Sequence, residues 1–254
     1  MHKWLILFSF ISLSAFAKNK NYSFSISNST SSNLKMNSTA EHYSSTSLSF
    51  GARYKNYSAS LAANKSLVGE MKLNIGNLVL GMSYPTKLEL AGWKFGFSSK
   101  AILPTSKSAR KISFLRLGSR HSASASRSVE VLGKNLYLSM FTSVGINFHQ
   151  YKTNLNGGSN HQQTYTVGGS FNLPLIKKVN LGVSGSTTKL ITYAGNDTDT
   201  YSLSQTLSTS YKKVGITLGH YLGGSLLSPN GTDLGVRLFD NERSNIFLDF
   251  SYSF

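Results

Sequence analysis

The sequence contains no cysteine, and both proline and acidic residues are scarce, with 4 Pro and 10 Asp plus Glu among 254 residues. Without cysteine, neither a disulfide framework nor a thiolate metal site can form. Charged residues make up 14% of the chain, well below the roughly 25% of soluble domains. Beyond the first segment, no run approaches the ~18 consecutive apolar residues of a membrane-spanning helix. A closed β-barrel is the other structure that can span a membrane with its backbone groups paired.

The first seventeen residues have the pattern of a targeting segment. Lys3 gives a positive start, an apolar stretch runs from about Trp4 to Leu13, and Ala15 and Ala17 supply the small residues of a cleavage site. We therefore predict that residues 1–17 are a secretory signal peptide. The apolar stretch is shorter than the ~20 residues that a membrane helix needs. The mature domain would then be residues 18–254, exported through the Sec route.

Apolar and polar residues alternate along most of the chain, most clearly from Ile246 to Phe254. Period-two alternation is typical of strands with one apolar face. The pattern slips at Ala91-Gly92, where we expect a β-bulge. Repetition of the pattern predicts an all-β fold with about twelve strands, at residues 20–30, 41–54, 56–63, 68–84, 88–101, 113–127, 136–150, 162–173, 178–192, 199–210, 213–226 and 243–254.

The connections between these strands are expected to alternate in length. Short ones are predicted near Tyr54–Asn56, Pro85–Lys87, Glu130–Asn135, Pro174–Lys178 and Tyr211–Lys213, and longer ones near Ser29–Thr39, Leu103–Lys111, Tyr151–His161, Ala194–Thr200 and Leu227–Ser244. Short turns on one side and long loops on the other are typical of transmembrane barrels. A soluble sandwich also alternates, but the polar face here carries Ser, Thr, Gly and Asn rather than Lys and Glu, which a water-exposed surface would favour.

The last nine residues, Ile246 to Phe254, resemble the C-terminal signature of Gram-negative outer-membrane β-barrel proteins. The matching positions are Leu248, Phe250, Tyr252 and Phe254. This resemblance implies recognition by the barrel-assembly machinery and a location in the outer membrane, in contact with its lipid and lipopolysaccharide. Together with the alternation, it predicts a single antiparallel transmembrane β-barrel of about twelve strands.

Function is less constrained than fold. Barrel interiors widen with strand number, so twelve strands lined by small hydroxylated residues should leave water inside. A lumen plugged by loops or by the N-terminal segment is the alternative. The leading prediction is a porin-like channel for passive diffusion of small solutes. The alternatives are a non-conducting structural or surface-interaction barrel, whose long loops bind lipid head groups or partners, and a membrane-embedded hydrolase.

Basic residues exceed acidic ones by 26 to 10, giving a formal net charge of +16. No acidic residue lies between Glu89 and Glu130. A positive lumen would favour anions, although a generally basic barrel without ion selectivity explains the charge equally well. In that stretch we place three basic residues on the inner face, namely Lys94, Arg116 and Arg120, and three in a long loop facing lipid head groups, namely Lys107, Arg110 and Lys111.

No catalytic or cofactor pattern stands out. The five histidines after residue 17 lack the neighbouring Ser-Asn-Gly context of outer-membrane phospholipases, so we predict that the chain is not an enzyme. Two groups of acidic loop residues could hold Ca²⁺, namely Asp197 with Asp199 and Asp233 with Asp240 and Glu242. No EF-hand spacing is present, and we predict no metal and no cofactor. Nucleic-acid binding is not expected, because no reading motif is present. Oligomeric state and solute identity are left open.

Overall fold

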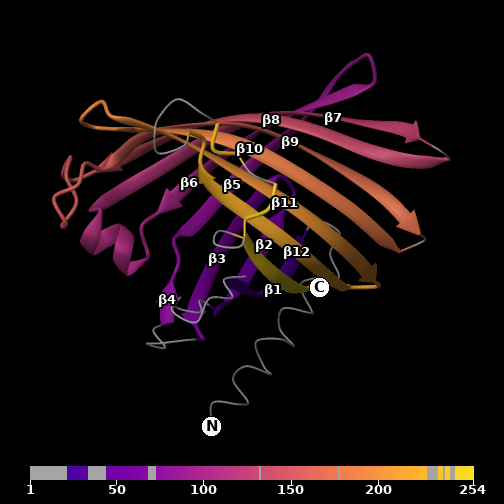
Figure 1. Cartoon of the computed structure of the whole chain (residues 1–254), viewed down its shortest axis with the longest axis horizontal. Coiled ribbons are helices and arrows are strands. Elements are labelled where there is room, and N and C mark those ends of the chain that lie inside the picture. The colour runs from indigo at the N-terminus through magenta and orange to yellow at the C-terminus, as the bar shows by residue number, and fades with distance from the viewer. Residues whose placement is uncertain are drawn as a thin grey trace, which may run out of the picture.

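The structure is a computed structural model, and it describes residues 22–33, 44–67, 73–131, 133–176, 178–227, 234–236, 238–240 and 244–254. The predicted signal peptide lies outside these residues. The strands form one antiparallel sheet that closes on itself, because β1 pairs with both β2 and β13, and β2 pairs with β3. Twelve strands form the closed ring and the short β4 pairs only with β3. Figure 1 shows the sheet curving around the molecule. The predicted twelve-stranded antiparallel barrel is confirmed.

The twelve ring strands follow one another around the barrel in chain order, so every neighbouring pair except β13 and β1 is consecutive along the chain. One short helix, η1, precedes β7. The elements are β1 (Tyr22–Asn33), β2 (Ser44–Tyr54), β3 (Tyr57–Ser66), β4 (Leu73–Ile75), β5 (Leu78–Leu90), β6 (Trp93–Leu103), η1 (Ser108–Ile112), β7 (Leu115–Val131), β8 (Lys134–His149), β9 (His161–Ile176), β10 (Val179–Thr192), β11 (Asp197–Tyr211), β12 (Val214–Ser225) and β13 (Ser244–Ser253).

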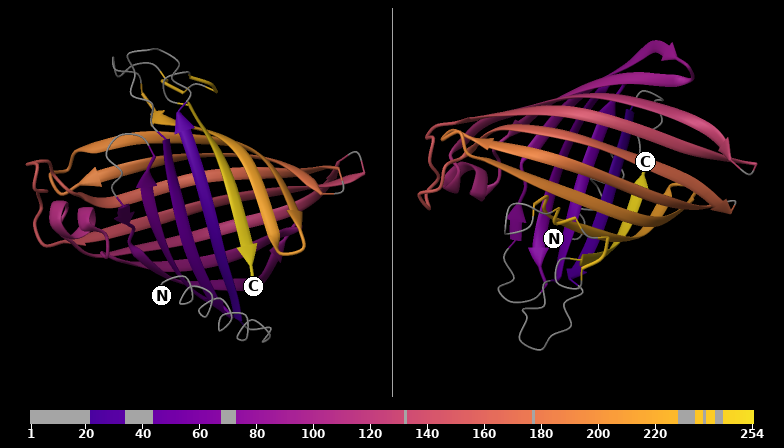
Figure 2. Two further views of the ribbon diagram at one scale, coloured as in Figure 1. Left: turned by 90° about the horizontal axis from the view of Figure 1, so that it is seen from below. Right: turned by 45° about the horizontal axis from the view of Figure 1, so that its top comes forward.

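The connections sort into two rims. Short turns join β2 to β3, β5 to β6, β7 to β8, β9 to β10 and β11 to β12 at one end, which we call the turn rim. The other end, the loop rim, carries η1 and most of the longer connections. Figure 2 shows the strands slanting around the barrel between these ends. Tyr22 pairs with Tyr54 beside a turn, and Phe254 N donates to Phe24 O at 2.9 Å. The two described ends of the chain therefore meet at the turn rim.

Two predicted connections were wrong. The turn expected at Pro85–Lys87 lies instead at Ala91-Gly92, where both residues have positive φ (50° and 77°). The bulge expected at Ala91-Gly92 lies instead between Pro85 and Glu89. Proline donates no backbone hydrogen bond, and a bulge tolerates this loss within a strand. The connection expected to be long at Ala194–Thr200 is a tight hairpin, because β10 continues to Thr192 and β11 begins at Asp197.

The pairing divides each strand into an outer and an inner face. Leu218 pairs with Leu248 and Ile216 with Phe250, and these four side chains stay 37–50% exposed. They belong to an apolar outer wall of the kind that faces lipid. Among the described residues, only three apolar side chains are buried, namely Ala109, Tyr201 and Leu222. The barrel therefore has no central apolar core, and its apolar surface points outward.

Part of the outer wall is covered by the chain itself. Phe239 stacks on His220 of β12, with ring centroids 5.6 Å apart. Leu222 and Ser244 nearby have no exposed surface. Phe239 therefore lies against the outside of the barrel rather than over its opening. Within the part of the chain that the structure describes, no helix is long and apolar enough to cross a membrane.

Candidate functional site: a two-sided constriction in the lumen

Two basic side chains stand side by side on the inner face. Lys100 of β6 is directly paired with Arg120 of β7. Each is flanked by a glycine on the next strand, Gly81 on β5 and Gly145 on β8. A Cβ atom at Gly81 would lie 3.6 Å from Lys100 Cγ, and one at Gly145 would lie 3.6 Å from Arg120 Nε. The missing side chains leave room for the two long basic side chains to lie along the wall.

Neither basic group has an acidic partner. Within the described ranges the structure records one ion pair, between Lys189 and Asp197, and it lies on the outer face. Lys100 and Arg120 are both exposed, and the barrel places them toward the lumen. Two neighbouring cations without a counter-ion create a positive potential, which the low-dielectric walls of a narrow passage concentrate.

The stagger of the strands shows which residues lie level with this pair. A path along paired residues starts at Lys100, circles the barrel and returns to Lys100. To return to its starting residue, the path has to shift along some strands toward the turn rim. The shifts are two residues along β11, four along β12, four along β1, five along β3 and one along β5, and their total of sixteen residues is the stagger of the closed sheet. Such a stagger tilts twelve strands by roughly 40°. Gly168 of β9 and Gly219 of β12 therefore lie level with Lys100.

A phenylalanine ring covers each of these two glycines. Phe141 of β8 pairs with Gly168, and a Cβ there would lie 2.7 Å from the Cε1 and Cζ atoms of its ring. Phe247 of β13 pairs with Gly219, and a Cβ there would lie 2.1 Å from its Cζ atom. Only glycine permits rings to lie this close to the backbone. Gly219 is six strands from Lys100, so the ring of Phe247 lies on the opposite wall.

Hydroxyl groups line the wall between the basic pair and the distal ring. Thr166 and Thr188 are joined by a 3.0 Å hydrogen bond, and Ser186 and Ser202 by one of 2.8 Å. A hollow of about 370 Å³ opens above them and is lined in part by Thr188, Ser202 and Tyr221. We call this level of the lumen the constriction. It combines cations, apolar ring faces and hydroxyls, and strand pairing also places the Asp249 carboxyl on the inner face, two residues from Phe247.

The residues predicted to carry charge in the lumen fall in different places. Lys94 pairs with Ser126 on the inner face and lies near the turn rim. Arg120 lies on the inner face, as described above. Arg116 is left unpaired by a bulge between Leu115 and Leu117, and its guanidinium donates to the Gln150 side chain. The inner-face position of Arg116 therefore stays a prediction.

The residues predicted for the loop and for assembly are also placed. Arg110 and Lys111 lie in η1 and Lys107 precedes it, and all three are exposed at the loop rim. The signature residues of β13 alternate onto the outer wall, with exposed fractions of 37% for Leu248, 46% for Phe250 and 40% for Tyr252. The roles predicted for these residues are untested by the fold. The last signature residue, Phe254, contacts Tyr252 edge-on, with ring centroids 4.8 Å apart.

Sequence reasoning missed three residues of the constriction. The alternation that puts Lys94 on the inner face also puts Lys100 there, so that signal was available. Phe141 and Phe247 interrupt otherwise polar inner faces, and such interruptions are the second available signal. Their seating on Gly168 and Gly219 depends on which strands are neighbours and on their register. A single strand's sequence carries no information about that pairing.

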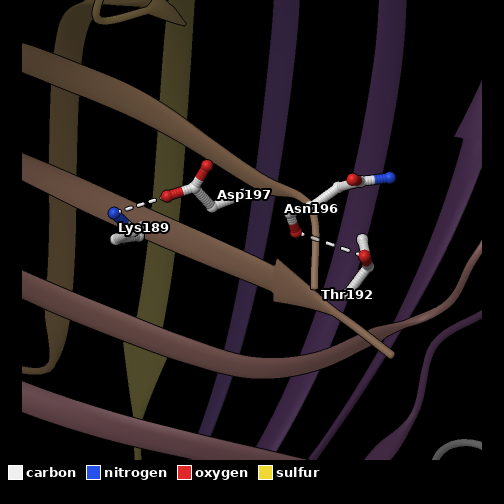
Figure 3. A network of polar contacts seen from close by, with 4 residues as sticks. All are labelled: Lys189, Thr192, Asn196 and Asp197. Carbon is white, nitrogen blue, oxygen red and sulfur yellow. Dashed lines mark hydrogen bonds and ion pairs between the residues drawn. The ribbon is translucent and has the colours of Figure 1, made fainter. Parts of the chain in front are cut away.

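The acidic residues weighed as a Ca²⁺ site are engaged otherwise. Asp197 and Lys189 lie 2.5 Å apart at the loop rim, beside the hydrogen bond from Thr192 Oγ1 to Asn196 O (Figure 3). The hydrogen bond and charge of Lys189 lower the pKa of the Asp197 carboxyl. Asp233 and Glu242 lie outside the described residues. Across the residues that the structure does describe, no cluster of three metal-binding side chains occurs.

One polar pair lies on the lipid-facing wall. Ser99 of β6 pairs with His121 of β7, and the Ser99 Oγ and His121 Nδ1 atoms are 3.0 Å apart. Inspection of residues next to each histidine in the chain could not find this pair, since the serine comes from the neighbouring strand. Polar groups facing hydrocarbon are costly unless they are paired, and this hydrogen bond provides the pairing.

The fold is shared with solved outer-membrane proteins. An outer membrane channel from Pseudomonas putida F1 is 10% identical, covers 92% of this chain and 95% of its own, and gives a TM-score of 0.58. The NanC porin is 10% identical, covers 91% of this chain and 98% of its own, and gives a TM-score of 0.55. No protein-family model and no curated protein matches the sequence. These likenesses show that the chain shares its barrel fold with outer-membrane channels.

The prediction that the chain is not an enzyme needs correction. LpxR from Salmonella typhimurium, an outer-membrane enzyme, is also among the similar structures. It is 10% identical over 91% of this chain and 99% of its own, with a TM-score of 0.45. The flat prediction that the chain is not an enzyme is therefore withdrawn.

Proposed function

We propose that this barrel is a porin-like channel for passive diffusion of small solutes, with a preference for anions. The observation that carries the proposal is the Lys100–Arg120 pair on the inner face, which has no acidic partner in the described chain. Twelve strands about 4.8 Å apart, tilted by roughly 40°, enclose a ring roughly 25 Å across between backbone walls. Small hydroxylated side chains line most of that ring, and they support a water-filled passage.

Anion preference follows from the local field. An anion that enters this level of the lumen loses part of its hydration shell. In exchange it gains attraction to the two cations and hydrogen bonds from Arg120 and the surrounding hydroxyls. A cation meets the same field as a barrier. Salt screens exposed charges beyond a Debye length of about 10 Å at 0.1 M, so the preference should weaken as ionic strength rises.

The test is single-channel recording in a planar bilayer with the refolded mature chain under a salt gradient. We expect steady open steps and a reversal potential that favours chloride over potassium. The double variant Lys100→Glu/Arg120→Glu should shift the reversal potential toward cations. A matched control, Lys65→Glu/Lys212→Glu, changes net charge equally but lies on the outer face and in a turn, so its reversal potential should stay that of the parent.

Two results would overturn the proposal. A folded barrel that never opens would indicate a plugged, non-conducting barrel, and attention would move to its loops. An open channel whose reversal potential is equal in parent and Lys100→Glu/Arg120→Glu would reject the basic pair as the source of selectivity. The same comparison with Lys94→Glu would show whether charge near the turn rim contributes.

We also propose that the basic residues of the loop rim meet lipopolysaccharide phosphates. Lys107, Arg110 and Lys111 are all exposed on or beside η1, and guanidinium and ammonium groups bind phosphate well. Residues 1–17 would be removed after Ala17 during export, which N-terminal sequencing of the purified protein would check.

A further inference from the structure

His220 is a polar residue on the wall that faces lipid. It lies between two leucines on the outer face of β12, and its Nε2 atom is buried and has no hydrogen-bond partner among the described residues. Polar groups facing hydrocarbon are costly unless they are paired or covered. The hydrogen bond between Ser99 and His121 provides a pair elsewhere on this wall. At His220 an aromatic ring provides a cover, because Phe239 stacks on the imidazole at an interplanar angle of 27°.

The segment that carries this ring comes down the outside of the barrel from the loop rim. After β12 ends, Leu227 pairs with Leu234 in an antiparallel bridge. Leu227 lies seven residues further along the chain than His220, and therefore further from the turn rim. The chain from residue 234 to residue 239 can span about 17 Å. That length, together with the side chain of Phe239, returns the ring to the level of His220.

The level of His220 lies inside the hydrocarbon part of the membrane. It is six residues above Val214, the first residue of β12, which pairs with the exposed aromatic residues Tyr211 and Tyr252 at the turn rim. Six residues rise by roughly 15 Å along a strand tilted by roughly 40°. The apolar band of an outer-membrane barrel is about 25 Å tall and lies between aromatic girdles. The Phe239 ring is therefore roughly 10 Å below the upper edge of that band.

The apolar side chains of this segment have no protein cover. Phe239 is 59% exposed, Leu238 73% and Val236 42%. Exposed apolar side chains that gather in one segment mark a surface that meets lipid or another protein. A stable protein interface buries more than about 1,000 Å², and three side chains supply much less than that. Acyl chains need no such minimum area, and they already surround the wall at this level.

The acidic residue next to the ring is held nearer to the loop rim. Asp240 O accepts a hydrogen bond from Ser244 N at 2.8 Å, and Asp240 N donates to Ser244 Oγ at 3.1 Å. Ser244 pairs with Leu222, which is two residues further from the turn rim than His220. Asp240 therefore lies above the ring, roughly 5 Å below the upper edge of the band. Its carboxylate does not have to enter the acyl chains beside the ring.

We propose that the connection between β12 and β13 docks into the membrane, with Leu238 and Phe239 among the acyl chains of lipopolysaccharide. The long loops of such barrels are extracellular, so the leaflet that receives the two side chains is the outer one. The docked segment covers His220 and fixes the connection to the wall just before β13 begins. This inference concerns the outer wall and does not depend on what passes through the lumen.

The experiment measures tryptophan fluorescence of the full mature chain refolded in phosphatidylcholine vesicles. Removal of residues 1–17 leaves one tryptophan, Trp93, so Trp93→Phe gives a dark background and Phe239→Trp adds a reporter. We expect vesicles with bromine at the middle of the acyl chains to cut the emission to less than half of that in unbrominated vesicles. Iodide on both sides of the vesicles should leave it nearly unchanged. Leu238→Trp in the same background keeps the ring on His220, and it should behave alike even where Phe239→Trp folds poorly.

The matched control is Leu155→Trp, in the connection after β8, where the leucine is 68% exposed beyond the end of the strand. It should be quenched by iodide and not by bromine. Iodide quenching of Phe239→Trp as strong as that of Leu155→Trp would place the segment in water and overturn the proposal. Resistance to both quenchers would overturn it too, because a protein surface such as a second copy of this chain would then cover the segment. None of these outcomes bears on the current through the lumen.

Discussion

The seating of phenylalanine on glycine is the residue-scale feature that shapes the lumen. Gly219 lies beneath the ring of Phe247, and a Cβ there would be 2.1 Å from the ring Cζ atom. No van der Waals contact tolerates that separation, so any side chain at this position must displace the ring. The glycine thus determines how far an aromatic group reaches into the passage.

Gly219→Ala should push Phe247 away from the wall and into the lumen. We expect a lower single-channel conductance and a loss of about 1–3 kcal/mol in the free energy of unfolding, the usual cost of overpacking. Conductance recordings and urea unfolding in detergent would measure both. Gly215→Ala is the control, because its Cβ would meet only the Ser251 side chain, with Oγ at 2.5 Å and Cβ at 3.9 Å, and a hydroxyl can rotate away. Equal conductance in the two variants would contradict the ring-seating argument.

At the scale of elements, the β5–β6 hairpin shows what local sequence can and cannot specify. Pro85 and the Ala91-Gly92 pair are both turn signals, and they lie within one strand length of each other. The choice between them depends on pairing with β3 and β7, which are distant in sequence. The turn takes Ala91 and Gly92 in the left-handed region, where two-residue hairpins commonly need glycine or asparagine.

Ala91→Gly should therefore stabilise the barrel. Alanine with φ of 50° carries a steric cost of roughly 1 kcal/mol that glycine avoids. We expect the free energy of unfolding to rise by about 1 kcal/mol in Ala91→Gly and to fall by about 1 kcal/mol in Gly92→Ala, which would appear as a higher and a lower urea midpoint. Equal midpoints for all three proteins would show that this turn opens before the barrel unfolds and contributes nothing to the measured transition.

Strand number, the two rims and the two faces were predictable because they depend on period-two alternation within each segment. The constriction was predictable only in part. Arg120 could be placed inside from alternation alone, and Lys100 could have been. Their adjacency, the glycines beside them and the level of Phe247 follow from register around the whole ring. Register depends on turn positions, and one misplaced turn alters the pairing of every residue on that strand.

For the whole molecule, the decisive contact is the seam between β1 and β13. Phe254 N donates to Phe24 O at 2.9 Å, and the Phe254 ring contacts Tyr252. Deleting Phe254 removes this bond and this ring at the end of the C-terminal strand. We expect a reduced yield of the heat-modifiable barrel on unheated gels, with Phe254→Tyr restoring most of it. A normal yield after deletion would count against the assembly role of the terminal strand.

The groups that make up the constriction belong to strands from the middle and the very end of the chain. Lys100, Arg120 and Phe141 lie on β6, β7 and β8, whereas Phe247 lies on β13, the strand that seals the cylinder. The wall that faces the basic pair therefore exists only when β13 is paired with β1. A cylinder open along this seam would keep both cations and lose the aromatic surface opposite them.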